Sequence, residues 1–338
     1  MIRTSLRSCL TIVLLCAGAA HAQQAAHVSP ASAPVTGGTQ VTINGSGFTP
    51  DMTVTFGGLG GVSAESRFVD SNTIIAVAPS HLPGPSTVTV FDRFFFRFAE
   101  APFLFVGAPE DAFEPMMLPI YTSALGRFGA VFSSFLTAFN TSSDQTIRMY
   151  GTGGFCDNFF FGPVDLLNTS HDIPPAHDDN GCGFQTGNPG VILWVQKELA
   201  SSFVANLRVA DLSRSFANFG TEIPVVRKAD FRNGAIALAG IPLTPQFRLT
   251  LRIYSLEQES TTVTVRWIQG GSETVDLRPA AGIFHPAYAQ VSQFPGFVAS
   301  PVPERADLLI EPSDPSRRIW AFVSVTNNET QDITVIAP

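Results

Sequence analysis

Residues 36–58 read TGGTQVTINGSGFTPDMTVTFGG, and this stretch decides the fold of the first part of the chain. Apolar and polar residues alternate at 40–43 and again at 52–56, which predicts two short strands with one buried face each. The pairs Gly37-Gly38 and Gly57-Gly58 bound these strands, and glycine admits the backbone angles that tight turns require. Short strands between such turns are typical of a β-sandwich.

With its flanking residues, this stretch resembles the IPT/TIG family of immunoglobulin-like domains. The matching elements are Pro30, Gly37-Gly38-Thr39, V-T-I-x-G-x-G-F at 41–48, V-x-F-G-G at 54–58, Pro79 and T-V-T-V at 87–90. The resemblance covers residues 28–107 and implies an immunoglobulin-like sandwich there. It also implies a spacer or binding module, as in receptors, bacterial surface proteins and starch-acting enzymes, and DNA contact as in some transcription factors.

The rest of the chain continues the strand pattern, with clear alternation at 247–254 and 262–267. Of its 338 residues only 14 % are charged, while Phe (29), Gly (28) and Pro (25) favour strands and turns. We predict an all-β chain of tandem β-sandwiches: an IPT/TIG-like domain at 28–107, a β-sandwich with a disulfide loop at 112–231, and another β-sandwich at 232–338. One larger domain over 112–338 is the alternative, and residues 108–111 are the expected linker.

Two strings in this second part, R-I-Y at 252–254 and W-A-F-V-S-V-T-N-N-E-T-Q at 320–331, are similar to those of uncharacterised exported proteins of soil bacteria that carry the same first module. That similarity implies no activity.

Residues 1–22 have the pattern of a cleaved signal peptide. Arg3 and Arg7 precede an apolar run at 10–20, and Ala20-His21-Ala22 is a small-x-small cleavage site. A helix of that run spans about 16 Å, too short for a bilayer core of about 30 Å. We therefore expect cleavage after Ala22 and a secreted, periplasmic or cell-surface protein whose mature chain has no transmembrane segment.

The mature chain would be acidic. Loss of Arg3 and Arg7 leaves 18 basic against 28 acidic residues, a formal net charge of −10. Such a surface repels phosphate backbones, and Arg317-Arg318 is only a pair, so we do not expect nucleic acid as a partner.

Two cysteines, Cys156 and Cys182, would remain after cleavage. In an oxidising compartment they most simply form one disulfide, with free thiols or metal ligands as alternatives. The bond would contribute about 3 kcal/mol of stability in the chain-entropy model.

Residues 168–182, NTSHDIPPAHDDNGC, hold the candidate metal ligands. An irregular calcium site would use Asp178, Asp179 and Asn180, although the loop fails the EF-hand pattern. His171 and His177 match no standard zinc spacing. A solvated loop, or a loop that contacts a glycan or partner, is the alternative, and we expect no cofactor other than calcium.

A run rich in phenylalanine occupies residues 91–105. A strand there would place Phe94, Phe96 and Phe98 on one face. This face either binds a glycan or protein partner or is buried against the next domain. Burial is the favoured interpretation because large exposed apolar patches are uncommon on soluble monomers.

Catalytic signatures such as Gly-x-Ser-x-Gly, His-Glu-x-x-His and the Walker loop are missing from the sequence. A hydrolytic carboxylate pair depends on separation in space, so it stays open. Its candidates are Asp165, Asp172, Asp178, Asp179 and Glu198. We predict a non-enzymatic binding or scaffold protein with a glycan or protein ligand at the cell surface; the alternative is a secreted carbohydrate-active hydrolase with an accessory first domain.

Overall fold

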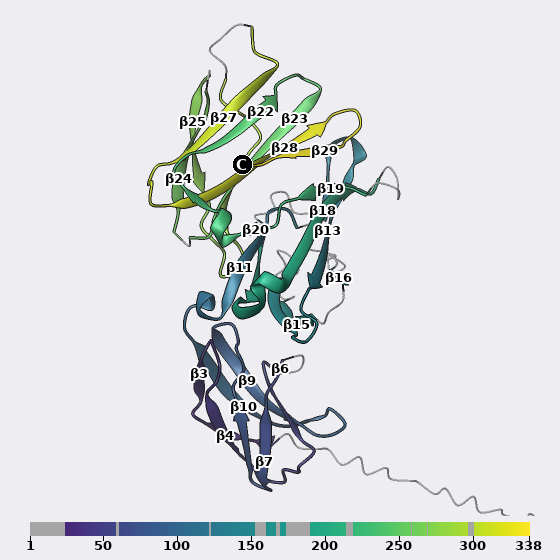
Figure 1. Cartoon of the computed structure of the whole chain (residues 1–338), viewed down its shortest axis with the longest axis vertical. Helices are drawn as coiled ribbons and strands as arrows, with labels where there is room; N and C mark the ends of the chain where they lie inside the picture. The colour runs from purple at the N-terminus through teal and green to yellow at the C-terminus, as the bar shows by residue number, and fades with distance from the viewer. Residues whose placement is uncertain are drawn as a thin grey trace, which may run out of the picture.

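The computed structural model describes residues 24–58, 61–121, 123–152, 160–166, 170–173, 190–213, 219–257, 259–268, 270–296 and 301–338. These residues form six sheets, stacked in pairs as three consecutive sandwiches, with only short 3-10 turns between them (Figure 1). The predicted all-β tandem sandwich is confirmed. Three sets of predicted features lie outside the described residues: the signal peptide, the cysteines Cys156 and Cys182, and the calcium candidates Asp178, Asp179 and Asn180.

The first sandwich pairs the sheet β2-β4-β8-β7 with the sheet β1-β10-β9-β5-β6, in which β3 also pairs with β10. As the alternation predicts, Val41 and Ile43 are fully buried between the sheets. The strands are β1 (Gln24–Ala25), β2 (His27–Ser29), β3 (Ser32–Pro34), β4 (Gln40–Asn44), β5 (Thr53–Phe56), β6 (Val62–Ser63), β7 (Ser66–Asp70), β8 (Thr73–Val77), β9 (Gly84–Phe91) and β10 (Arg97–Val106).

The second sandwich pairs the sheet β15-β14-β17-β11-β20 with the sheet β12-β13-β18-β19, in which β16 also pairs with β13. Its elements are η1 (Pro109–Asp111), β11 (Phe113–Leu118), β12 (Ser123–Leu125), η2 (Arg127–Gly129), β13 (Val131–Asn140), β14 (Ile147–Thr152), β15 (Phe160–Leu166), β16 (Ser170–Ile173), β17 (Val191–Gln196), η3 (Lys197–Ser202), β18 (Phe203–Asp211), β19 (Thr221–Ile223), β20 (Val226–Arg227) and η4 (Lys228–Asp230).

The third sandwich pairs the sheet β21-β28-β23-β26, with β29 beside β28, and the sheet β22-β27-β24-β25. Leu251 and Ile253 on β23 are fully buried in its core, as the alternation at 247–254 predicts. Its strands are β21 (Arg232–Asn233), β22 (Ile236–Pro242), β23 (Phe247–Ser255), β24 (Thr261–Trp267), β25 (Ser272–Leu277), β26 (Ala287–Val291), β27 (Arg305–Pro312), β28 (Arg318–Asn327) and β29 (Ile333–Ile336).

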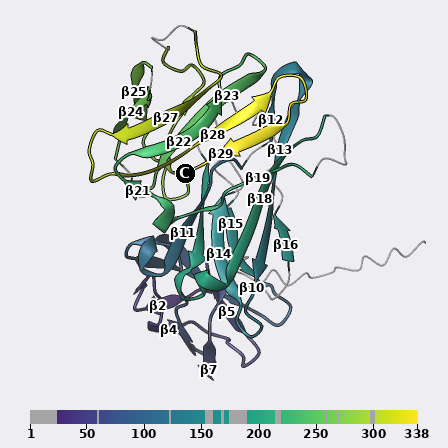
Figure 2. The same cartoon turned by 45° about the horizontal axis from the view of Figure 1, so that its top comes forward.

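The second and third sandwiches share buried surface. The core of the second sandwich extends into four aromatic residues of the third: Tyr254, Tyr288, Trp320 and Phe322. The Tyr254 hydroxyl donates a hydrogen bond to the Pro119 carbonyl at 2.6 Å. Figures 1 and 2 show β29 beside β19, where the Thr221 hydroxyl donates to the Ile333 carbonyl at 2.5 Å. The division at residue 232 stays a prediction, and limited proteolysis tests it.

The first and second sandwiches also meet through packed side chains. A small buried cluster joins them to one end of the third sandwich; its members are Leu82, Phe113, Tyr150, Ile192 and Trp194. The His81 ring stacks on Phe105 with centroids 4.5 Å apart and meets the edge of the Tyr150 ring at 5.5 Å. The junction therefore has aromatic contacts from both sides.

Residues 108–111 form a bonded turn between these two sandwiches. The Lys197 backbone N–H donates to the Ala112 carbonyl at 2.9 Å, and the Lys197 Nζ donates to the Glu110 carbonyl at 3.0 Å. The Asp111 carboxylate accepts from the Ala108 N–H at 3.2 Å. We therefore expect this segment to resist proteases better than an open linker would.

The His81 side chain at this junction predicts a pH dependence. Its pKa is lowered because burial disfavours the imidazolium; the hydrogen bond to the Leu82 carbonyl opposes this lowering and the charge of Arg148 adds to it. The unfolded chain takes up a proton below about pH 6.5, and the folded chain does so only at lower pH. The contribution to stability is thus present above about pH 6.5 and is lost as the pH falls through the lowered pKa.

The test is the melting temperature between pH 7.5 and 5 for the wild type and His81→Gln. We expect the wild type to lose more on acidification, since glutamine takes up no proton. Equal losses would show that another group sets the acid response.

Candidate functional site

The phenylalanine run does not continue as one strand. Strands β9 and β10 form a hairpin, and residues 92–96 are its loop. The Asp92 Oδ1 accepts the backbone N–H groups of Phe94 at 2.8 Å and Phe96 at 2.9 Å. Two further backbone bonds, Asp92 N–H to Phe96 O and Phe95 N–H to Asp92 O, close the loop at 3.0 Å each. The expected strand across these residues is therefore wrong, because the Asp92 carboxylate holds a turn.

The loop presents three adjacent aromatic rings to solvent. Phe94, Phe95 and Phe96 are 63 %, 77 % and 69 % exposed. Burial of this face against the next domain, the favoured interpretation of the sequence, is therefore wrong for Phe94 and Phe96. Figure 1 shows the hairpin loop projecting sideways from the first sandwich, clear of the other two.

Phe98 does not share this surface. It is half-buried beside the first core, with its ring centroid 6.1 Å from that of Phe48. The structure thus separates Phe98 from Phe94 and Phe96 and adds Phe95, which the alternation placed on the opposite face. The signal that identifies the loop is Asp92, since Asp side chains bond backbone N–H groups two residues on in turns.

The charges around the loop nearly balance. The Arg93 guanidinium lies 4.6 Å from the centroid of the Phe94 ring. At the other end, Arg97 forms an ion pair with Glu100 at 3.0 Å. The surroundings of the three rings are therefore mixed in charge and not basic.

The Asp92 bonds predict a measurable cost of substitution. Asp92→Ala removes the acceptor of two N–H groups, and we expect the first sandwich to lose about 1–3 kcal/mol of stability. Asp92→Asn retains the Oδ1 acceptor and should lose less than half as much. Urea unfolding with amide exchange at Phe94 and Phe96 measures both. Equal losses for the two variants would contradict the proposed role of Oδ1.

The remaining candidate carboxylates are dispersed where the structure describes them. Asp172 on β16 is exposed and accepts the Thr137 hydroxyl at 2.7 Å. Glu198 is exposed in η3. The side chains of Asp165, Asp178 and Asp179 lie outside the described part. Within the described residues, no three His, Cys, Asp or Glu side chains are grouped to hold a metal ion.

One pocket of about 200 Å³ lies between the second and third sandwiches, and Asp211 and Asp332 both line it. It is smaller than ligand pockets of about 300–1,000 Å³. The Asp211 Oδ1 accepts the Val131 N–H at 2.9 Å and the N–H and hydroxyl of Ser213 at 3.0 and 2.7 Å. These bonds fix the ends of β13 and β18, so Asp211 has a structural task in the fold.

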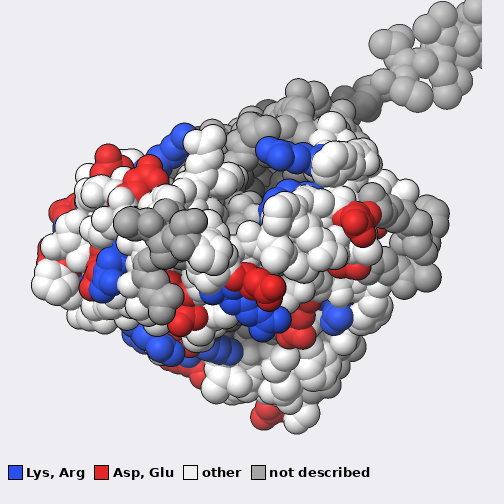
Figure 3. Space-filling view, turned by 90° about the horizontal axis from the view of Figure 1, so that it is seen from above, with Lys and Arg blue, Asp and Glu red and all other residues white. Residues whose placement is uncertain are grey.

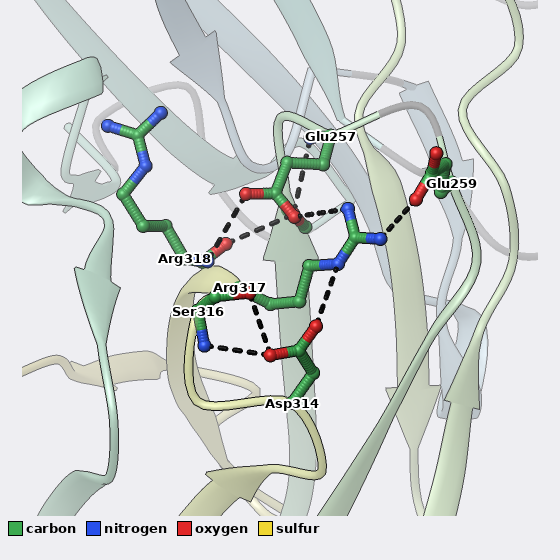
Figure 4. A network of polar contacts seen from close by, with 7 residues as sticks. Glu257, Glu259, Asp314, Ser316, Arg317 and Arg318 are labelled. Atoms are coloured by element: carbon green, nitrogen blue, oxygen red, sulfur yellow. Dashed lines mark hydrogen bonds and ion pairs between the residues drawn. The ribbon is translucent and has the colours of Figure 1, made fainter.

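Within the Arg317-Arg318 pair, the Arg317 guanidinium is engaged with carboxylates, and the Arg318 backbone N–H donates to Glu257 at 3.5 Å. Arg317 bonds Glu257 at 2.9 Å, lies 3.7 Å from Asp314 and also pairs with Glu259 (Figure 4). The hydrogen bonds to Glu259 and Glu257 raise the pKa of Arg317. The face in Figure 3 likewise intersperses acidic and basic side chains.

None of the helical segments in the described ranges has the length and apolar character needed to cross a bilayer.

Comparison with known proteins gives one family match. Residues 26–105 match the model of the IPT/TIG domain, two residues earlier at both ends than the predicted boundaries 28–107. No curated protein matches the chain.

Three solved structures align over most of the chain at low similarity. Two are auxiliary nutrient binding proteins. That of Bacteroides ovatus has 12 % identity and a TM-score of 0.23, covering 94 % of this chain and 70 % of its own. That of Bacteroides thetaiotaomicron has 9 % identity and a TM-score of 0.21, covering 93 % and 85 %. The third, InvD of Yersinia pseudotuberculosis, has 9 % identity and a TM-score of 0.18, covering 94 % and 98 %.

At such TM-scores these likenesses carry no argument about the present chain. The family match agrees with the sandwich and with the motifs of its first strands. Residues 26–105 are an IPT/TIG domain, the immunoglobulin-like module of this chain.

Proposed function

We propose that this protein is a non-enzymatic binding or scaffold protein that acts outside the cytoplasm, with the loop of Phe94, Phe95 and Phe96 as its contact surface. The observation that carries the proposal is the exposure of all three rings, 63–77 %. Leaving a phenylalanine in water forgoes about 1.5–3 kcal/mol relative to full burial. Contiguous exposed apolar groups of this kind mark interaction sites.

The three sandwiches form a support that holds the contact surface in place. Both junctions between sandwiches contain buried aromatic side chains, so the loop is carried on a body with few free hinges. The signal-peptide pattern of residues 1–22 supports export. A glycan or a protein is the ligand class that the sequence favours.

A binding screen of residues 23–338 against glycans, cell-wall fractions and surface proteins tests the proposal. The informative variant is Phe94→Ser/Phe95→Ser/Phe96→Ser, and the matched control is Phe128→Ser/Phe219→Ser, whose rings are 71 % and 79 % exposed elsewhere. We expect binding to be lost in the triple variant and kept in the control.

Product analysis of every hit tests the hydrolase alternative. Cleavage of a bound glycan would establish a hydrolase and overturn the non-enzymatic role. Binding that is unchanged in the triple variant would remove the loop from the proposal.

A further inference from the structure

The three phenylalanines of the aromatic loop have their backbone N–H groups hydrogen-bonded inside the loop. The N–H groups of Phe94, Phe95 and Phe96 all donate within the loop, two of them to the Asp92 carboxylate and one to the Asp92 carbonyl. A glycan or peptide site normally offers free donors and acceptors to its ligand. Here those three donors are already used, and the rings are what the loop presents. These three backbone groups enter an apolar medium with little loss of hydrogen bonds to water.

The shape of the loop also favours a partner that deforms around it and needs no preformed pocket. It is the convex end of a long hairpin, and Phe95 has a left-handed backbone with φ of 62°. This backbone breaks the strand alternation that would align Phe94 and Phe96 on one flat face, the arrangement suited to stacking on a sugar. A bilayer interface accepts a convex apolar tip without a matching cavity.

The chain enters the first sandwich beside this loop. Strand β1 (Gln24–Ala25) pairs in parallel with Ala99 and Glu100, close to the end of β10 that adjoins the loop. The apolar run at 10–20 ends four residues before Gln24. Four residues span at most about 14 Å. While the predicted signal peptide is attached and lies in a bilayer, it therefore holds this end of the domain at the membrane.

We propose that the loop of Phe94, Phe95 and Phe96 inserts its rings into the interface of a lipid bilayer. This proposal rests on the proposed function, because it uses the same contact surface, and it names a lipid bilayer as the partner in place of the glycan or protein that the sequence favours. Insertion is driven by the apolar rings and not by charge, since Arg93 lies over the Phe94 ring, Arg97 is paired with Glu100 and residues 23–338 have a net charge of −10. The contact is weak and reversible, as expected of one short apolar anchor.

The test is co-sedimentation of residues 23–338 with phosphatidylcholine vesicles. We expect the triple serine variant to bind at least tenfold more weakly and the Phe128→Ser/Phe219→Ser control to bind as the wild type does. Phe95→Trp should show a blue-shifted emission on vesicle addition and quenching by brominated lipid. Circular dichroism checks that each variant is folded.

A second vesicle series, containing anionic phosphatidylglycerol, tests the driving force. Binding should be weaker there because the protein is acidic; stronger binding would overturn insertion driven by the rings. Absence of vesicle binding, or equal binding by wild type and triple variant, would also overturn the inference. If vesicles fail but a glycan or protein is bound through the loop, the proposed function survives alone; if neither binds, both fall.

Discussion

Replacing Gly37 with alanine should destabilise the first sandwich by about 2–5 kcal/mol and leave the cores of the other two sandwiches intact. Gly37 has φ of 73°, and an added Cβ would lie 2.5 Å from the Pro79 carbonyl carbon, 2.6 Å from the Ser80 nitrogen and 2.7 Å from the Ala78 oxygen. All three are backbone atoms, so the clash cannot be relieved by turning a side chain. The left-handed backbone costs about 1–2 kcal/mol and the overpacking about 1–3 kcal/mol more.

The adjacent glycine provides a matched control. Gly38 has φ of 80°, but an added Cβ there meets no heavy atom within 4 Å. Gly38→Ala should therefore lose only the backbone cost of about 1–2 kcal/mol. Calorimetry together with hydrogen exchange over 24–106 separates the two variants. If Gly37→Ala and Gly38→Ala lose the same stability, the close approach to residues 78–80 is not what fixes this turn.

Phe322→Ala should destabilise the second and third sandwiches together. Phe322 on β28 is fully buried, and its ring lies parallel to that of Tyr254 at 6.4 Å and 5.4 Å from that of Trp320. Its ring belongs to the core that the two sandwiches share. Truncating a buried phenylalanine costs about 3–5 kcal/mol. Because the Phe322 ring is part of the core that both sandwiches share, we expect the unfolding of both to shift.

Phe322→Leu is the control, since it retains most of the apolar volume and should cost about 1–1.5 kcal/mol. Urea denaturation followed by near-ultraviolet circular dichroism and by proteolysis of each half measures the effect. A shift confined to residues 232–338 would mean that the two sandwiches are energetically separate.

The strands of the first sandwich could be predicted because their glycines and alternating residues act locally. Val41 and Ile43 face the core as a period of two requires. The aromatic loop could not be predicted in the same way. Alternation of Phe94, Phe96 and Phe98 fits a strand, but one carboxylate that accepts two N–H groups outweighs that pattern.

The core shared by the second and third sandwiches could not be predicted from the sequence. One stretch of sequence is nevertheless consistent with it. Residues 319–323 read IWAFV, an unbroken apolar run that is typical of a strand buried on both faces. One face packs within the third sandwich and the other against the second. Sequence alone does not say which element covers the second face, since that depends on contacts remote in the chain.

The parallel pairing of Gln24 with Ala99 joins the two ends of the first sandwich, so the sandwich is complete only when both ends are present. Its first strand has no partner until the last strand has been synthesised, so these contacts have a high sequence separation. Closing such a long loop costs conformational entropy before any stabilising contact forms. Folding is therefore expected on the millisecond-to-second time scale of β-proteins. A chain that folds this late remains extended long enough to be threaded through a narrow pore.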